Sequence, residues 1–213
     1  MMNMIKMVEQ IKALRLVPVV KLNHVSEAEP LADALIRGGL PVAEVTFRTD
    51  AAEESISLLN KKYPDMCVGA GTVVNVEQAK RAVNAGAKFL VSPGTNRKVI
   101  EFAIESDVPV FPGTCTPSEI MTVMEYGLPV VKFFPAKQYG GVDTIKSLAA
   151  PFPGMLFMPT GGINAENVMS YLAFNKIIAC GGSWMVKGEL ISSGNFDEIT
   201  RLTREAVNLV RGN

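Results

Sequence analysis

A single lysine, Lys132, interrupts an apolar run at residues 128–134, LPVVKFF, that otherwise has the composition of a buried strand. A full ammonium is expensive to bury without a partner. Burial favours the neutral amine of a lysine, and a neutral amine is a nucleophile that can attack a carbonyl carbon and form a Schiff base. The pattern therefore indicates either such chemistry or a lysine at a strand end that reaches water.

Three polar residues alternate with apolar ones in the segment AEVTFRT at 43–49, namely Glu44, Thr46 and Arg48. Side chains of a strand alternate between its two faces, so these three share one direction. An arginine can hold a carboxylate through two parallel hydrogen bonds, and a partly buried carboxylate can transfer protons. A structural ion pair between Glu44 and Arg48 is the alternative interpretation.

Two Gly-Gly pairs follow apolar runs late in the chain, in PTGG at 159–162 and GGSW at 181–184. Glycine lets backbone amides approach an anion closely, and a pair of such turns after the last two strands is typical of a phosphate site. Tight turns alone would also account for either pair. The candidate phosphate residues are Gly161, Gly162, Gly182 and Ser183, and Thr160 is a further polar residue that ends the seventh run before its Gly-Gly pair.

Eight short apolar runs recur at intervals of about 20–27 residues, long enough for one strand, one helix and two loops. Helix-start signals follow several of them, such as Thr116 with Glu119 three residues later. Eight units of this kind predict a (β/α)8 TIM barrel with an additional N-terminal helix, as one domain spanning residues 1–213. An open doubly wound sheet is the alternative, but it would usually show a Gly-rich turn after the first strand. The runs lie at 16–20, 41–47, 66–71, 88–94, 108–113, 128–134, 155–162 and 176–184.

In such a barrel the active site lies at the carboxyl ends of the strands. Thr72 follows the third run. The polar residues and glycines described in the first three paragraphs lie in or directly after the second, sixth, seventh and eighth runs. Lys88 begins the fourth run, at the opposite end, where a structural role is expected. Together the rim residues predict a site for a keto acid phosphate.

The composition excludes several classes of protein. Hydrophobic residues make up 48% of the 213 residues and the formal net charge is zero, so we expect a globular protein that binds neither nucleic acid nor an anionic membrane. The N-terminus lacks the features of a signal peptide and no run is long enough to span a membrane, so we expect a cytoplasmic protein. Three scattered cysteines and one histidine, His24, argue against a zinc site and a Ser-His-Asp hydrolase.

The motifs EVTFRT, GAGTV, SPG, KFFPA, PTGGI and GGSWM, in this order, resemble the bacterial 2-keto-3-deoxy-6-phosphogluconate (KDPG) aldolase family, including its 4-hydroxy-2-oxoglutarate (KHG) members. The resemblance covers nearly the whole chain. It implies a class I aldolase of the Entner-Doudoroff pathway, on a (β/α)8 barrel, that needs no metal or other cofactor, takes a small keto acid substrate and assembles as a homotrimer.

The resemblance also implies roles for individual residues. Lys132 matches the Schiff-base lysine, Glu44 the acid/base glutamate and Arg48 the arginine that contacts the pyruvate carboxylate. Thr72, Pro93 and Thr160 match residues of the pyruvate end, whereas the phosphate end is matched by Gly161, Gly162, Gly182 and Ser183.

Two positions depart from the family pattern, and other reactions remain open. The first strand can end in arginine in the family where this chain has Lys21, and Cys115 has no assigned role, so the preferred aldehyde and the gluconate or galactonate stereochemistry stay undetermined. A phosphate-binding barrel isomerase or epimerase, with Glu44 as base and Lys132 as electrophile, would need similar groups. A non-catalytic sugar-phosphate binder is a third hypothesis.

Overall fold

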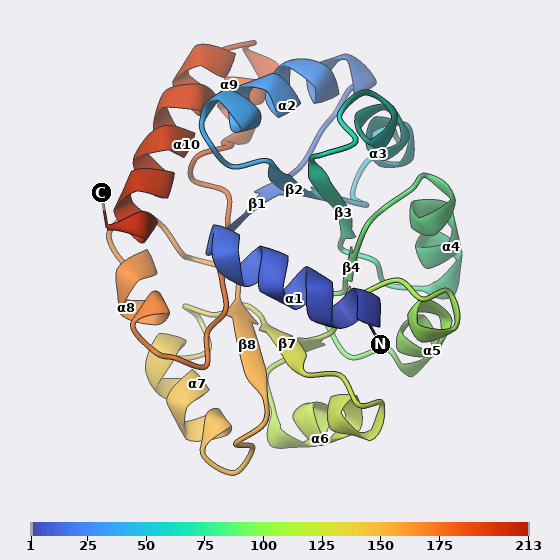
Figure 1. Ribbon diagram of the computed structural model, residues 1–213, viewed down its shortest axis with the longest axis vertical. Helices are drawn as coiled ribbons and strands as arrows, with labels where there is room; N and C mark the ends of the chain where they lie inside the picture. Colours follow the sequence, from blue (N-terminus) through green and yellow to red (C-terminus); the bar gives the residue numbers. More distant parts are fainter. Residues whose placement is uncertain (1, 213) are drawn as a thin grey trace.

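Strands and helices alternate along nearly the whole chain in the computed structural model, which describes residues 2–212 (Figure 1). Met1 and Asn213, the ends of the predicted domain, lie outside the described residues. The strands are β1 (Leu16–Val20), β2 (Val42–Thr46), β3 (Cys67–Gly71), β4 (Leu90–Val91), β5 (Val110–Phe111), β6 (Gly113–Thr114), β7 (Val130–Phe133), β8 (Leu156–Pro159) and β9 (Cys180–Gly182). The helices are α1 (Met2–Leu14), the 3-10 turn η1 (Val25–Glu27), α2 (Ala28–Arg37), α3 (Ala51–Lys62), α4 (Val76–Asn84), α5 (Arg97–Glu105), α6 (Pro117–Glu125), α7 (Gly141–Ala149), α8 (Val168–Leu172), α9 (Gly188–Ser192) and α10 (Phe196–Arg211).

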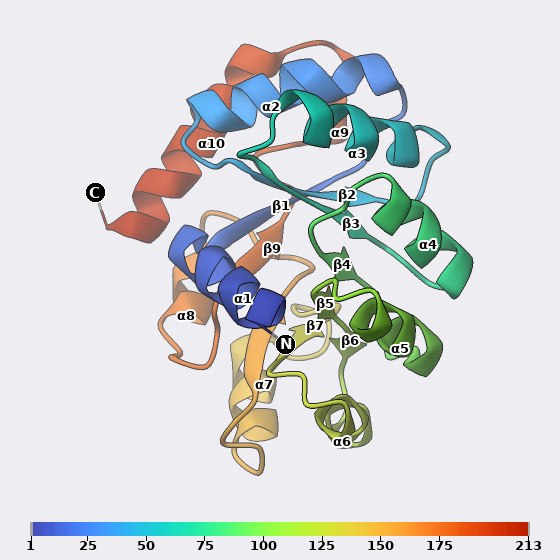
Figure 2. The same ribbon diagram turned by 45° about the vertical axis from the view of Figure 1, so that its right-hand side comes forward.

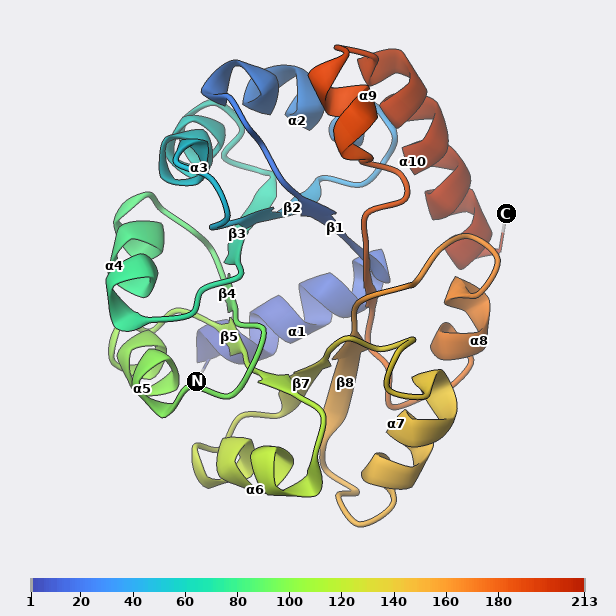
Figure 3. The same cartoon turned by 180° about the vertical axis from the view of Figure 1, so that it is seen from behind.

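All strand pairings are parallel, and the strands form two curled sheets. One sheet has the order β5-β4-β3-β2-β1-β9 and the other the order β6-β7-β8. Isolated parallel bridges, Phe157 with Ile177 and Thr160 with Gly181, join β8 to the segment that contains β9. The ribbon shows the strands arranged around a common centre with α2–α8 and α10 outside them (Figure 3). The predicted α/β class with parallel strands is therefore confirmed, and the open doubly wound sheet is not what forms.

The fifth predicted strand, residues 108–113, is divided at Pro112 into β5 and β6. Proline has no N–H and cannot continue a ladder as a donor. Its carbonyl accepts the Lys132 N–H at 2.8 Å, whereas the carbonyl of Phe111 accepts the Ser92 N–H at 3.3 Å. The two halves of this run thus pair with different sheets, so the prediction of one continuous strand is corrected.

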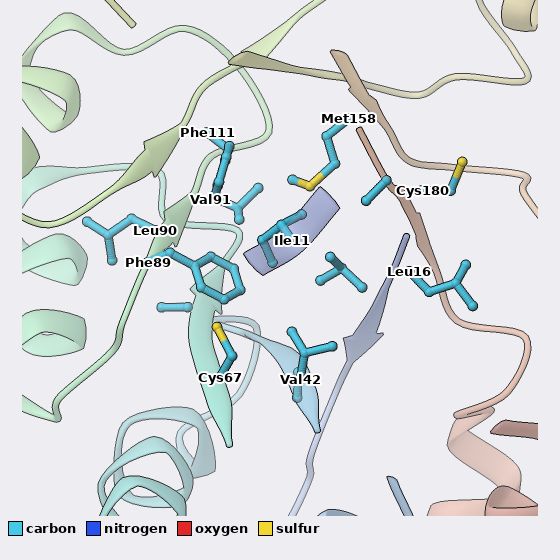
Figure 4. Packing of buried hydrophobic residues seen from close by; sticks show 14 of the residues in the cluster. Ile11, Leu16, Val42, Cys67, Phe89, Leu90, Val91, Phe111, Met158 and Cys180 are labelled. Atoms are coloured by element: carbon cyan, nitrogen blue, oxygen red, sulfur yellow. The ribbon is translucent and has the colours of Figure 1, made fainter. Parts of the chain in front are cut away.

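Helix α1 lies across the end of the ring where the strands begin (Figure 2). Its Met4, Met7 and Ile11 are buried, and the Met7 sulfur lies 3.7 Å from Sγ of Cys67 at the start of β3. Figure 4 shows Ile11 among side chains contributed by the strands. At this end Lys88 donates to the carbonyls of Pro64 and Met66, which is the structural role predicted for it.

The loops after the strands begin helices on the other side of the ring. Thr116 accepts the Glu119 N–H while the Glu119 carboxylate accepts the Thr116 N–H, so the predicted capping box forms. Two amides at the start of α6, those of Thr116 and Glu119, are thereby satisfied. Among the described residues, no helix has both the length and the apolar character that crossing a membrane requires.

Candidate active site

Lys132 and Glu44 meet inside the ring. The Lys132 ammonium, on β7, donates a hydrogen bond to Oε1 of Glu44, on β2, over 3.3 Å. The two side chains are only 6% and 1% exposed, so the hypothesis of a strand-end lysine reaching water is wrong. Two buried charges tolerate desolvation only as partners, which explains why one carboxylate accompanies one lysine here.

Gly71, at the end of β3, makes room for the carboxylate. A Cβ atom at this position would lie 2.2 Å from Oε1 of Glu44. The neighbouring strands are held in register, with Thr46 opposite Gly71. Any larger residue at position 71 would therefore displace the group that pairs with Lys132.

Two buried oxygens at the strand ends have no hydrogen-bond partner among the described residues: Oε2 of Glu44 and Oγ1 of Thr160. Thr160 follows β8 directly, and a Cβ atom at Gly181 would lie 2.2 Å from its Oγ1. Buried polar atoms without partners are costly, and in native proteins each calls for an explanation. A polar ligand bound beside Lys132 supplies one. The other atoms of this kind are Arg15 Nε, Ser55 Oγ, Asn60 Oδ1 and Thr203 Oγ1.

Arg48 is fixed by Thr46 rather than by Glu44. Its Nε donates to Oγ1 of Thr46 over 3.1 Å, and that hydroxyl donates to the carbonyl of Val20 over 2.8 Å. No ion pair between Arg48 and Glu44 forms in the described part of the chain, so the alternative of a structural pair is wrong. Since Nε is occupied, the two terminal amino groups of the guanidinium remain for a ligand.

Phe134 is a site residue that the sequence prediction missed. Its ring centroid lies 5.1 Å from Nζ of Lys132, within the range of a cation–π contact. Alternation along the strand could have found it, since residues 132 and 134 share a face. Its ring gives the lysine an apolar wall.

Thr72 and Pro93 lie at the ends of β3 and β4, as predicted, and both are half-buried. Thr72 has a positive φ of 57°. A Cβ atom at Gly113 would lie 2.3 Å from the carbonyl carbon of Pro93, and Gly113 is paired with Lys132 in the ladder. Neither Thr72 nor Pro93 makes a hydrogen bond with Lys132 in the described chain, so their contact with a ligand remains a prediction.

The glycines that follow β8 and that end β9 have packing roles that the sequence does not reveal. Gly161 and Gly162 have φ values of 104° and 70°, a region that favours glycine. A Cβ atom at Gly162 would lie 2.5 Å from Cβ of Lys137, and one at Gly182 would lie 2.0 Å from the Trp184 ring. The presence of glycine alone is therefore not evidence for an anion site.

Free backbone donors are the stronger indication at this corner. Neither the N–H of Gly162 nor that of Ser183 donates a hydrogen bond within the described residues. Ser183 is also exposed. Unpaired amides in glycine-containing turns are the usual components of a phosphate cradle.

Metal chemistry would need a group of ligands, and thiol chemistry would need a reactive cysteine near the rim. No group of three or more His, Cys, Asp or Glu residues that could hold a metal ion occurs among the described residues. Burial raises the pKa of the Cys115 thiol, and the nearby Glu119 carboxylate raises it further. A thiol that stays protonated is a poor nucleophile.

Known proteins share both the sequence and the fold. The sequence model of a family described as KDPG and KHG aldolase matches residues 7–202. A 2-dehydro-3-deoxy-phosphogluconate aldolase of Haemophilus influenzae is 44% identical over 97% of each chain.

Two solved structures are similar as well. The KDPG aldolase of Legionella pneumophila, with pyruvate captured at low pH as a covalent carbinolamine intermediate, has a TM-score of 0.90 and 38% identity, covering 93% of this chain and 97% of that one. The KDPG aldolase of Zymomonas mobilis with 3-phosphoglycerate has a TM-score of 0.87 and 36% identity, covering 95% of each chain.

A parallel α/β ring with a buried lysine–glutamate pair at the strand ends defines an enzyme of the lysine-dependent aldolase class. The chain belongs to the KDPG and KHG aldolase family.

Proposed function

We propose that this chain reversibly cleaves 2-keto-3-deoxy-6-phosphogluconate to pyruvate and glyceraldehyde 3-phosphate through an imine on Lys132, and that it also cleaves 4-hydroxy-2-oxoglutarate to pyruvate and glyoxylate. The observation that carries the proposal is the 3.3 Å contact between a buried ammonium and a buried carboxylate. The covalent pyruvate intermediate of the Legionella relative supports it.

The chemistry follows from these two groups. Lys132 first passes a proton to Glu44, and the resulting amine attacks the C2 carbonyl of the keto acid. Glu44 returns that proton to the carbinolamine hydroxyl, which leaves as water and gives a protonated imine. Glu44 takes the proton of the C4 hydroxyl, the C3–C4 bond breaks, and its electron pair moves through C3 and C2 to the imine nitrogen. Glu44 then returns the proton to C3 of the enamine, and hydrolysis releases pyruvate and the free lysine.

The remaining residues bind the two ends of the substrate. The terminal amino groups of Arg48 hold the carboxylate, and Thr72, Pro93, Phe134 and Thr160 enclose the pyruvate carbons. The phosphate lies on the backbone amides at the other end, where the candidate residues are Gly161, Gly162, Gly182 and Ser183. The 3-phosphoglycerate in the Zymomonas relative supports a phosphate end in this family.

Borohydride trapping with pyruvate tests the proposal. The wild type should gain the mass of one reduced pyruvate adduct on Lys132, and product analysis with both keto acids should show pyruvate release from each. Absence of any lysine adduct, with the fold intact, would instead favour an isomerase, an epimerase or a binder.

Assembly and context complete the proposal. The two sheets close as a (β/α)8 barrel in a single domain of residues 1–213, working in the cytoplasm as a homotrimer without metal or cofactor.

Exposed apolar side chains on α1, α5 and α6 support an assembly, since a monomer rarely gathers such groups on neighbouring elements. They are Met2, Ile5, Ile104, Met121 and Met124. Sedimentation velocity of the wild type and of Ile104→Lys tests the oligomer.

A further inference from the structure

Lys137 lies beside the Gly161–Gly162 turn. The chain after β7 continues along the chain after β8, because Ala136 N–H donates to the Thr160 carbonyl at 2.8 Å and Lys137 N–H to the Gly161 carbonyl at 3.0 Å. The backbone of Lys137 is therefore fixed at the corner where Gly162 has its free amide.

The side chain of Lys137 runs over Gly162. The position that a Cβ atom of Gly162 would occupy is 2.5 Å from Cβ, 3.2 Å from Cγ and 2.9 Å from Cδ of Lys137. Gly162 thus leaves the space that the aliphatic stem fills. Packing of a lysine stem on a surface commonly leaves its charged end in water.

The ammonium of Lys137 has no acidic partner. The residue is exposed, and it makes no side-chain hydrogen bond or ion pair with another described residue. Asp143, in the helix that follows, pairs with Lys146 instead. Glu166 makes no ion pair with any of the described residues. An unpaired cation beside Gly162, whose amide is free, is well placed to meet an anion.

We propose that Lys137 is a specificity-determining residue, whose ammonium binds the phosphate of phosphorylated keto acids next to the amides of Gly162 and Ser183. This inference rests on the proposed aldolase function. It assigns the preference for a phosphorylated substrate to a lysine that the sequence motifs do not mark. Gly162 then has a second role besides its free amide, because the stem of Lys137 packs on it.

The test compares kcat/KM for 2-keto-3-deoxy-6-phosphogluconate with kcat/KM for 4-hydroxy-2-oxoglutarate, which has no phosphate. In Lys137→Met, which keeps an unbranched apolar stem, the ratio should fall by about 3- to 30-fold, as expected for one charge-assisted hydrogen bond at a solvated rim. Inhibition by inorganic phosphate should weaken by a similar factor. Lys137→Arg keeps a cation at this position and should retain the wild-type ratio and the wild-type inhibition by phosphate. Lys98→Met, in the first turn of α5 on the same rim, is the matched control and should leave the ratio at the wild-type value.

The outcomes separate the hypotheses. If the wild type forms no pyruvate adduct, the aldolase function fails and this inference with it. If the wild type forms the adduct but Lys137→Met keeps the wild-type ratio and phosphate inhibition, Lys137 is not the phosphate ligand while the aldolase function stands. An equal fall in Lys137→Met and Lys98→Met would also overturn the inference, because it would reflect only the general charge of the rim.

Discussion

Glu44 and Lys132 are 88 residues apart in the chain and belong to different sheets, yet their charged ends lie 3.3 Å apart. The contact exists because both sheets curl around one centre, so that residues facing inward from β2 and β7 converge there. Both side chains are almost fully buried, so the pair is both the candidate reactive group and a constraint on the fold.

Lys132→Met should abolish the reduced pyruvate adduct and keto acid cleavage, because no other lysine lies in contact with Glu44 among the described residues. It should also destabilise the protein by about 3–5 kcal/mol, since Glu44 would be left buried without its counter-charge. Mass spectrometry after borohydride and urea unfolding measure the two effects.

The double variant Lys132→Met/Glu44→Gln is the control for folding. Removing both charges should recover part of the lost stability while activity stays absent. An adduct that persisted in either variant would falsify the assignment of Lys132.

Glu44→Gln keeps the size of the side chain and removes the group that transfers protons. Turnover should fall by about 10²–10⁴-fold, the range for loss of a general acid–base, while pyruvate trapping slows but remains detectable. Steady-state kinetics and trapping rates at saturating pyruvate measure this. A fall below tenfold would mean that Glu44 serves mainly as the counter-ion of Lys132.

Thr46→Val should weaken binding of the keto acid carboxylate. The change removes the hydroxyl that fixes Nε of Arg48, so the guanidinium loses its orientation although its charge remains. The pyruvate concentration for half-maximal trapping should rise by about 10- to 100-fold, the cost of one hydrogen bond to a charged group, with little change at saturation.

Thr46→Ser provides the matched control, because it keeps the hydroxyl between Arg48 and the Val20 carbonyl. It should behave like the wild type in trapping. A loss of maximal rate in Thr46→Val, with an unchanged half-saturating concentration, would argue for a general disturbance of β2.

The sequence predicts the parallel α/β class, and it places the candidate site residues at the strand ends. Both predictions are possible because buried strands and helix caps have recognisable local sequence patterns. Glu44 and Lys132 were predicted as neighbours on one rim, but their contact depends on the curvature of two sheets, which local patterns do not encode. Thr46 fixing Arg48 was missed for a similar reason, since the Val20 carbonyl comes from another strand. The apolar run at 108–113 predicts one continuous strand, but Pro112 has no N–H to donate to a ladder, and the strand is divided there.

The role of a glycine is harder to predict from sequence than the position of a strand. The Gly-Gly pairs, one after β8 and one within β9, suggest room for a phosphate, whereas Lys137 and Trp184 occupy the space beside Gly162 and Gly182. Sequence alone does not reveal which neighbour requires a glycine, because the neighbour can be either a ligand or a side chain.

Gly71→Ala should impair both stability and catalysis. The added Cβ atom would lie 2.2 Å from Oε1 of Glu44, so the carboxylate must move away from Lys132. Overpacking of this kind typically costs about 1–3 kcal/mol. Gly94→Ala, where no atom lies within 4 Å of the added Cβ, should stay near wild type in unfolding and in kinetics. Equal behaviour of the two variants would contradict the close packing of Glu44 against β3.

Cys67 is buried at the start of β3, and titration of its thiol should lower the free energy of unfolding at alkaline pH. Burial raises the pKa of its thiol from 9.0 to about 11, against the opposing positive charge of Lys88. The folded state therefore holds the proton more tightly than the unfolded chain, so its contribution to stability is present below pH 9 and is lost as the pH rises towards 11. In that window one thiol can lower the free energy of unfolding by about 1.4 kcal/mol per pH unit. Urea unfolding between pH 8 and pH 10.5 should show a shallower decline for Cys67→Ala than for the wild type. The comparison of slopes cancels the constant cost of the smaller side chain, and parallel slopes would show that Cys67 does not titrate differently in the two states.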